Sequence, residues 1–388
     1  MAPVQLAPGI HWVGAVDWSL RYFHGYITQR GTSYNSYLIV DEKIAIIDTV
    51  KAPFVDTLLA NITEIVPLEK VDYIISLHVE QDHSGSLPAL LAACPNAQLV
   101  TSAPAGIRGL EAHFGKLDAQ LVKTGDTLNL GQRSLQFLQT PMLHWPDNTV
   151  AFMPEEGILF SSDAFGQHLA RSKRFDDQVP FAELMHEAAK YYANIVLPFG
   201  QQTLKALEAA SQLKPRIVAP AHGIIWRSHI EDIVAKYADW ATNKVADKAV
   251  VVYDTMWHAT EAMAHSITDV FIERGLEVEL MCLQTNHMSD VMVKLLEAKY
   301  IAIGSPTINN QMLPSVAGFL CYLKGLAPKN RIGLAFGSYG WSGQSIGQVA
   351  DIMQELGWEL PIEPQKVVYK PTPEYLLELK QQVMGIIK

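Results

Sequence analysis

The sequence predicts two domains. The first is a mixed α+β domain, and the second is an α/β domain with a doubly wound parallel sheet. Short strand-like runs separated by turns fill the first 246 residues, and fully apolar strands alternate with longer helices from residue 249 onward. The chain of 388 residues is also longer than a single hydrophobic core supports. The polar stretch 241–248 separates the two patterns, so we expect domains at residues 1–246 and 247–388.

In the first domain, strands are expected where short apolar runs lie between turn signals, at residues 37–40, 44–47, 71–77, 98–100, 135–138, 158–160 and 217–219. Helical stretches at residues 87–93, 181–193 and 203–213 interrupt these strands. This mixture is typical of an α+β domain and not of a sandwich or a helix bundle.

In the second domain, we expect strands at residues 249–253, 278–283, 300–303 and 332–335. Each is followed by a helical stretch, at residues 260–274, 289–298, 313–324 and 345–356, and a last helix begins near residue 374. Strands that are apolar throughout indicate a parallel sheet with helices on both faces.

The composition narrows the class of protein. Net charge is −10 and both halves are acidic, so a nucleic-acid partner is not expected. No apolar run approaches the ~20 residues that cross a bilayer, and the N-terminal segment lacks the basic start of a signal peptide. Three widely spaced cysteines fit a reduced compartment. We therefore expect a cytoplasmic protein without a membrane partner.

Histidine and carboxylate side chains follow several of the strands in the first domain. The segment 78–83 comes directly after the strand at 71–77, and three further candidates follow other strands. One such histidine alone is more often a capping or core residue, but four segments together indicate a metal site. Seven donors exceed the four of a single zinc site, and hard oxygen donors suit iron or manganese, so we expect two ions with Asp163 as the bridge. The candidate ligands are His78, Glu80, Asp82, His83, His144, Asp163 and His222.

Loops rich in small and hydroxyl residues follow three strands of the second domain, at residues 254–260, 304–310 and 337–343. Ligands bind beyond the carboxyl ends of such strands, and a helix N-terminus is a site for anions. Such loops are also ordinary turns, but three at one sheet edge favour a cofactor. The candidate residues are Thr255, Met256, Trp257, His258, Ala259, Thr260, Pro306, Thr307, Asn309, Asn310, Ser338, Tyr339, Gly340 and Trp341.

The pattern HxHxDH after a strand, with His, Asp and His downstream, is typical of the metallo-β-lactamase fold. This chain departs from it at Glu80, and its HxExDH version resembles the flavodiiron proteins, also called A-type flavoproteins. The stretches 142–147 and 191–195 resemble that family too, and the resemblance covers essentially the whole chain. It implies a metallo-β-lactamase-like αββα domain followed by a flavodoxin-like domain that binds FMN.

The resemblance also implies roles for the candidate residues. His78, Glu80 and His144 are expected to bind one iron and Asp82, His83 and His222 the other, with Asp163 between them. Trp341 or Tyr339 is expected to stack on the flavin, and Asp254 is expected to point away from its phosphate. His24, Tyr26 and Tyr191 are candidates to line the catalytic pocket, although ordinary packing explains each of them as well.

The activity that the resemblance implies is the reduction of O2 to water, of NO to N2O, or of both. Electrons are expected to come from a separate donor, rubredoxin or reduced coenzyme F420, and to pass through FMN to the irons. A head-to-tail homodimer or a dimer of dimers is also implied. The alternative is a metallo-β-lactamase-fold hydrolase with two zinc ions and a second domain used for docking, against which Glu80 and the flavin loops argue.

Overall fold

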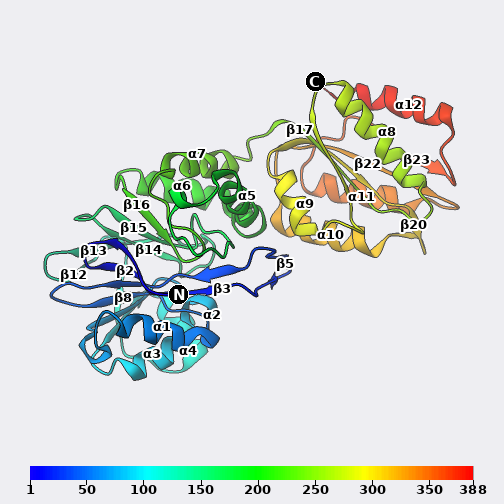
Figure 1. The fold of residues 1–388 in the computed structure, drawn as a ribbon. Coiled ribbons are helices and arrows are strands. Elements are labelled where there is room, and N and C mark those ends of the chain that lie inside the picture. Colours follow the sequence, from blue (N-terminus) through cyan, green and yellow to red (C-terminus); the bar gives the residue numbers. More distant parts are fainter. Residues whose placement is uncertain (388) are drawn as a thin grey trace. The chain divides into compact units, whose positions relative to one another are not determined.

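The computed structural model describes residues 1–387, which divide into two compact units (Figure 1). The first unit comprises Met1–His24, Thr28–Tyr191 and Gln201–Ala238. The second comprises Gly25–Ile27, Tyr192–Gly200 and the chain from Asp239 onward. The second unit thus includes two short pieces of the N-terminal half, and the predicted boundary between residues 246 and 247 stays a prediction.

Two sheets form the centre of the first unit. The seven-stranded sheet runs in the order β1 (Val4–Ala7), β2 (Ile10–Trp12), β7 (Tyr37–Ile39), β8 (Ala45–Ile47), β9 (Tyr73–Ser76), β10 (Gln98–Ser102) and β11 (Ala119–Val122). The five-stranded sheet runs in the order β12 (Thr127–Asn129), β13 (Ser134–Gln139), β14 (Thr149–Met153), β15 (Ile158–Ser162) and β16 (Ile217–Pro220).

Strands β7 to β10 of the seven-stranded sheet each contribute side chains to two cores, because successive side chains along a strand point to opposite faces of the sheet. Tyr37 and Ile39 of β7 face the second sheet and pack in one core with Phe137 of β13. Leu38, between them, packs on the other face with Leu58 of α1 (Val55–Thr63). Helices α3 (Leu87–Ala93) and α4 (Ala105–Phe114) also contribute to that second core.

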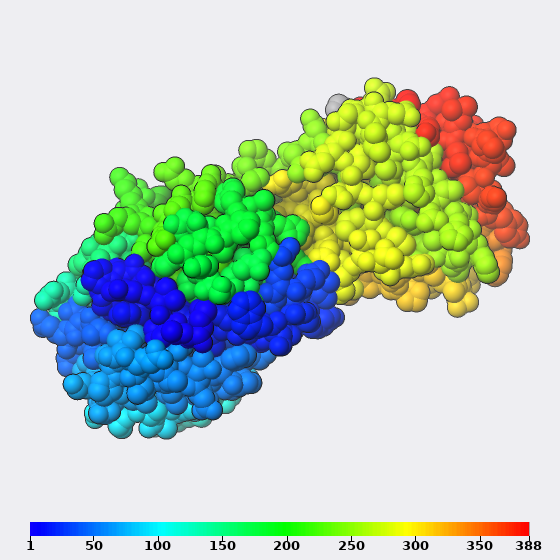
Figure 2. Space-filling view, viewed as in Figure 1, coloured from blue at the N-terminus to red at the C-terminus, as the bar shows by residue number. Residues whose placement is uncertain are grey.

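Helices α5 (Phe181–Tyr191), α6 (Gly200–Ala210) and α7 (Ile230–Ala241) accompany the five-stranded sheet (Figure 1). The first unit is therefore a four-layer αββα structure, as the resemblance implied. In Figure 2 its N-terminal strands, in dark blue, lie at the surface between the light-blue residues of α1 and α3 and the green residues of α5 and α6.

The second unit contains five parallel strands in the order β18 (Glu277–Cys282), β17 (Ala246–Tyr253), β19 (Ala298–Gly304), β22 (Ile332–Tyr339) and β23 (Gln365–Val368). Numbered within the unit, this order is 2-1-3-4-5, that of flavodoxin. Helices α8 (Ala259–Glu273) and α12 (Pro373–Met384) pack on one face. Helices α9 (Met288–Leu295), α10 (Pro314–Leu326) and α11 (Gln344–Glu355) lie on the other (Figure 1).

Short elements complete the part of the chain that the structure describes. Among them are helix α2 (Gln81–Ser84), which carries two of the predicted metal ligands, and a π-helical turn, Tyr192–Val196. The remaining strands are β3 (Ala15–Asp17), β4 (Tyr22–Phe23), β5 (Tyr26–Ile27), β6 (Thr32–Tyr34), β20 (Thr307–Ile308) and β21 (Gln311–Met312). Within residues 1–387, no helix combines the length and the apolar character needed to span a membrane.

Candidate metal centre and cofactor pocket

The seven predicted metal ligands all leave the ends of strands in the first unit. His78 and Glu80 follow β9, and Glu80 directly precedes α2, which carries Asp82 and His83. His144 lies in the loop between β13 and β14, and Asp163 directly follows β15. His222 follows β16, the parallel neighbour of β15, so these two ligands leave the same end of the sheet.

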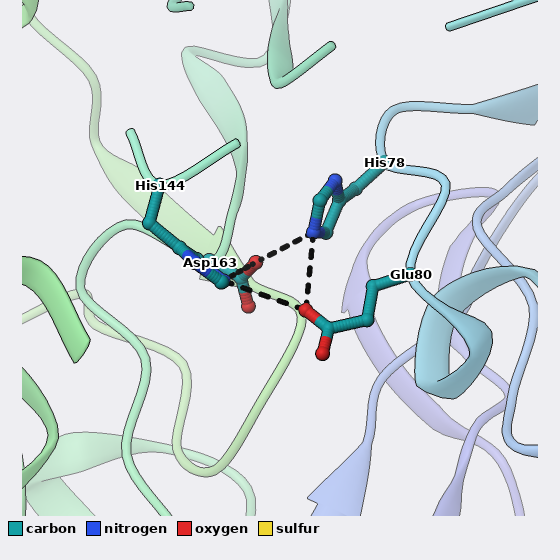
Figure 3. A group of neighbouring side chains, drawn as sticks. All are labelled: His78, Glu80, His144 and Asp163. Atoms are coloured by element: carbon teal, nitrogen blue, oxygen red, sulfur yellow. Dashed lines mark hydrogen bonds and ion pairs between the residues drawn. The ribbon is translucent and has the colours of Figure 1, made fainter. Parts of the chain in front are cut away.

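The structure brings these side chains together in two groups. His78, Glu80, His144 and Asp163 form the first group, whose possible ligand atoms all lie within 4.8 Å of one another (Figure 3). The Nε2 atoms of His78 and His144 lie 3.4 and 3.5 Å from Glu80 Oε2. The second group contains Asp82, His83 and His222, all of them buried.

Asp163 faces both groups, one carboxylate oxygen to each. Its Oδ2 atom lies 3.5 Å from His78 Nε2 and 3.3 Å from His144 Nε2. Its Oδ1 atom lies 3.3 Å from the Nε2 atoms of both His83 and His222. This is the arrangement of a carboxylate that bridges two ions.

The distances fit two bound ions. Two donors on one ion at about 2.1 Å lie roughly 3.0–3.4 Å apart. Three of the four separations around Asp163 match this spacing and the fourth, to His78, is 3.5 Å. The 3.2 Å between Asp82 Oδ2 and His222 Nε2 also matches it. In addition, Asp82 Oδ1 is buried without a hydrogen bond, which is costly for a carboxylate unless a cation satisfies it.

Two histidines are oriented by hydrogen bonds from their other ring nitrogen. Asp147 Oδ2 lies 2.9 Å from His78 Nδ1 and also accepts a hydrogen bond from the Val79 amide at 2.8 Å. His222 Nδ1 lies 2.9 Å from the carbonyl oxygen of Ser33. Both contacts leave Nε2 directed at the cluster, as metal-binding histidines require. Asp147 was not among the predicted site residues, although it lies only three residues after His144.

Without an ion, the cluster shifts the pKa values of its own members. Burial lowers the pKa of His78, but its hydrogen bonds to Asp147 and Glu80 outweigh burial and raise the pKa to about 9. For Asp163, burial raises the pKa, but the surrounding histidines outweigh it and hold the pKa well below its ordinary value. The pocket therefore keeps Asp163 ionised, which is the form that binds a metal ion.

Two of the three predicted pocket residues contact the ligands. His24 Nε2 lies 2.7 Å from Glu80 Oε1, and its side chain is 68% exposed. The hydroxyl of Tyr191, at the end of α5, donates to Asp163 Oδ1 at 2.7 Å, and burial raises its pKa well above the ordinary value. Tyr26 is buried in the second unit. Its predicted role stays a prediction.

The second unit has a cavity of about 390 Å³ at the carboxyl ends of its strands. The cavity is built from the three predicted loops, and ten of the fourteen predicted cofactor residues line it: Met256, Trp257, Ala259, Pro306, Thr307, Asn309, Ser338, Tyr339, Gly340 and Trp341. Trp257 and Trp341 are 88% and 75% exposed, so both rings are open to a flat ligand. Ile308 and Tyr369 also line the cavity. Neither was a predicted cofactor residue, and Tyr369 follows β23, a strand that was not predicted either.

The other four predicted cofactor residues lie beside this cavity. Thr255 and Thr260 are buried, and the Thr260 hydroxyl contacts that of Ser338 at 3.0 Å. His258 contacts Glu261, and Asn310 is exposed. Their contact with FMN stays a prediction.

The carboxylate of Asp254 is held by neighbouring side chains. It accepts a hydrogen bond from Gln284 at 2.6 Å and another from Ser315. Asp254 is not among the residues that line the cavity, as expected for a negative charge that must avoid a phosphate.

Comparison with known proteins identifies both units. A family model described as ODP family beta lactamase matches residues 32–223, and one described as flavodoxin matches residues 251–379. The nitric oxide reductase of Moorella thermoacetica is 46% identical over 94% of this chain and 93% of its own. The rubredoxin-oxygen oxidoreductase of Megalodesulfovibrio gigas is 42% identical over 100% of this chain and 98% of its own.

The crystal structure of the flavodiiron protein from Giardia intestinalis superposes with a TM-score of 0.97 at 35% identity, covering 100% of this chain and 96% of that one. The chain belongs to the flavodiiron proteins. This flavodiiron protein has the two domain folds that the sequence predicted, and its seven donors and its flavodoxin domain fit a di-iron centre and FMN. Its named relatives are oxidoreductases, which favours that class over the zinc hydrolase.

Proposed function

We propose that this flavodiiron protein reduces O2 to water, NO to N2O, or both, with electrons that pass through FMN to a di-iron centre. The observation that carries the proposal is the Asp163 carboxylate, whose two oxygens face two separate groups of donors. The activities named for the relatives from Moorella and Megalodesulfovibrio support the choice of substrates.

The proposed ligands follow the two groups. His78, Glu80 and His144 hold one iron, and Asp82, His83 and His222 hold the other, with Asp163 shared. Iron bound by these residues would supply the redox chemistry for the reduction of a diatomic oxidant. Glu80 supports this redox role because an anionic ligand stabilises the higher oxidation state of the metal better than a neutral imidazole does.

Two side chains next to the ligands have proposed supporting roles. Tyr191 holds Asp163 by a hydrogen bond and so fixes the orientation of the shared carboxylate. His24 is exposed and contacts Glu80, which places it to carry protons between solvent and the pocket. Tyr26 is proposed to help exclude water.

FMN is proposed to occupy the cavity of the second unit. The small residues of the loops allow close approach of the backbone, and Trp341 or Tyr339 stacks on the isoalloxazine ring. The hydroxyls of Thr307 and Ser338 are available at the same cavity for polar contacts.

The electron donor is proposed to be a separate protein or cofactor. Rubredoxin is the first candidate, because it appears in the name of a relative that is 42% identical. Reduced coenzyme F420 is the second, since several archaeal relatives are named coenzyme F420H(2) oxidases. A cytoplasmic head-to-tail homodimer, or a dimer of such dimers, completes the proposal.

An anaerobic assay of the reconstituted protein tests this function. Protein loaded with iron and FMN should consume O2 or NO when rubredoxin and its reductase supply electrons, and zinc-loaded protein should not. His222→Ala should abolish consumption while the flavin spectrum is retained. His229→Ala, a histidine seven residues away that pairs with Asp232, is the matched control and should leave the rate unchanged. Cleavage of esters by the zinc form, with no consumption of either gas by the iron form, would contradict the proposal.

A further inference from the structure

Three neighbouring hollows lie beneath helix α6 in the first unit. The innermost is a cavity of about 30 Å³, and two larger hollows of about 290 and 440 Å³ lie next to it. The cavity shares Leu138, Thr140 and Ala206 with the first of these. It shares Phe165 and Leu207, among others, with the second. The three hollows therefore form one adjoining series.

The innermost cavity is apolar because its hydroxyl groups are already engaged. The hydroxyl of Thr140 accepts a hydrogen bond from Asn148, and that of Ser161 donates to the carbonyl oxygen of Ala164. The hydroxyl of Tyr237 accepts a hydrogen bond from the Phe165 amide. Aliphatic and aromatic side chains form most of the remaining wall.

The cavity has room for one small molecule but is a poor site for water. A volume of about 30 Å³ exceeds the roughly 10–15 Å³ that a water needs. A water held there would lack the two to four polar partners that buried waters require, whereas apolar cavities of this kind stay dry and take up xenon. An apolar diatomic gas loses no hydrogen bonds on entry.

The wall of the cavity adjoins the metal centre along the chain. Leu143 and Ala164 both line the cavity and are both buried. Leu143 directly precedes the ligand His144, and Ala164 directly follows the ligand Asp163. The cavity therefore lies against two of the loops that carry the first group of donors.

We propose that this cavity is a gas-binding compartment, which takes up O2 or NO from the hollows beneath α6 and holds it next to the metal centre. The role in delivery rests on the proposed function, since it assumes that such a gas is the substrate. The binding of an apolar gas does not rest on it. Concentrating an apolar substrate near the cluster raises its rate of encounter without any new polar contact.

Xenon is the probe for the compartment, in pressurised crystals of the full chain and in solution by xenon NMR. Xenon should occupy the cavity in the wild type. Ala206→Phe should remove xenon, because it places a ring in the wall that the cavity shares with the hollow of about 290 Å³. Leu207→Trp is a second blocking variant, in the wall that the cavity shares with the hollow of about 440 Å³. Leu204→Phe is the matched control, because Leu204 is exposed on the same helix and lines none of the three hollows.

The kinetic arm uses iron- and FMN-loaded protein at varied O2 and NO. Both blocking variants should lower kcat/KM for the gas several-fold with kcat unchanged, and Leu204→Phe should change neither. Absence of xenon from the wild-type cavity would overturn the proposal, and so would unchanged kcat/KM in variants that have lost xenon. If wild-type protein consumed neither gas while xenon still occupied the cavity, the proposed function would fail and the gas-binding site would stand.

Discussion

Replacing Trp341 by alanine tests the flavin pocket, because this side chain is 75% exposed and lines the cavity. A tryptophan side chain presents up to about 250 Å². Three quarters of that area is open here, and a flavin stacked on one face covers roughly half of it, or about 90 Å². At about 25 cal/mol per Å², losing this contact costs roughly 2 kcal/mol, or about a thirty-fold rise in the Kd for FMN.

Titration of flavin-free protein with FMN, followed by quenching of flavin fluorescence, measures this Kd. Trp341→Phe keeps a ring for stacking and should lose much less affinity than Trp341→Ala. Trp18→Ala removes an exposed tryptophan of the first unit and should leave the Kd unchanged. A Kd for Trp341→Ala within a factor of two of the wild-type value would refute the stacking role.

Further predictions concern the metal centre. Asp147→Ala removes the partner of His78 Nδ1 and should weaken iron binding by about 10–100-fold in a chelator competition. Asp147→Asn keeps an acceptor oxygen and should lose less affinity for iron. Equal losses in the two variants would contradict the orienting role of Asp147. In iron-free protein, the pKa values of His78, His144 and His222 are raised to about 9 from 6.5. The stability that these imidazolium groups contribute is fully present below pH 6.5 and is lost as the pH rises through 9. The Tm of the iron-free protein should therefore fall between pH 6.5 and 9. A flat or rising Tm over that range would contradict this prediction. Iron-loaded protein should show no such fall, because its histidine ligands are already neutral.

Much of the fold was predictable because most of its central strands are short apolar runs bounded by turn residues. The helix at residues 87–93 coincides with α3, and the strands of the second domain follow the predicted order along the chain. Several elements were not predicted: the strands β1 to β6, β11, β12, β14, β20, β21 and β23, and the helices α1, α2, α4 and α7. Strand β14 is buried along its whole length, but so is the predicted strand β15, so burial does not explain why only β14 was missed. Strand β11 and strand β23 are short edge strands whose place depends on their neighbours.

The metal donors were recognisable in the sequence because histidine and carboxylate side chains follow several strands of the first domain. Their division into two groups was implied by the family resemblance, and the geometry around Asp163 is consistent with it. The contact between Asp147 and His78 was not predictable, because it depends on the path of the loop between β13 and β14. The sequence around an aspartate in a loop does not indicate which side chain that aspartate contacts in the folded protein.

Two short segments from the first 200 residues belong to the second unit, which the sequence pattern did not indicate. Gly25–Ile27 and Tyr192–Gly200 belong to the second unit, although both lie far from residue 239 in the chain. Within that unit, the Ile27 amide donates to the Ser289 hydroxyl, and the Asn194 amide group donates to the Ser289 carbonyl. Such long-range contacts arise from tertiary packing and leave no periodic pattern in the sequence.

The central claim is that one carboxylate joins two iron ions, and iron counting combined with Mössbauer spectroscopy tests it most directly. Wild-type protein reconstituted with iron-57 should hold two irons per chain whose spins are coupled through the shared ligand. His222→Ala should retain one iron of the pair, with the coupling lost. A single iron per wild-type chain, or two irons that behave as magnetically independent ions, would contradict the account.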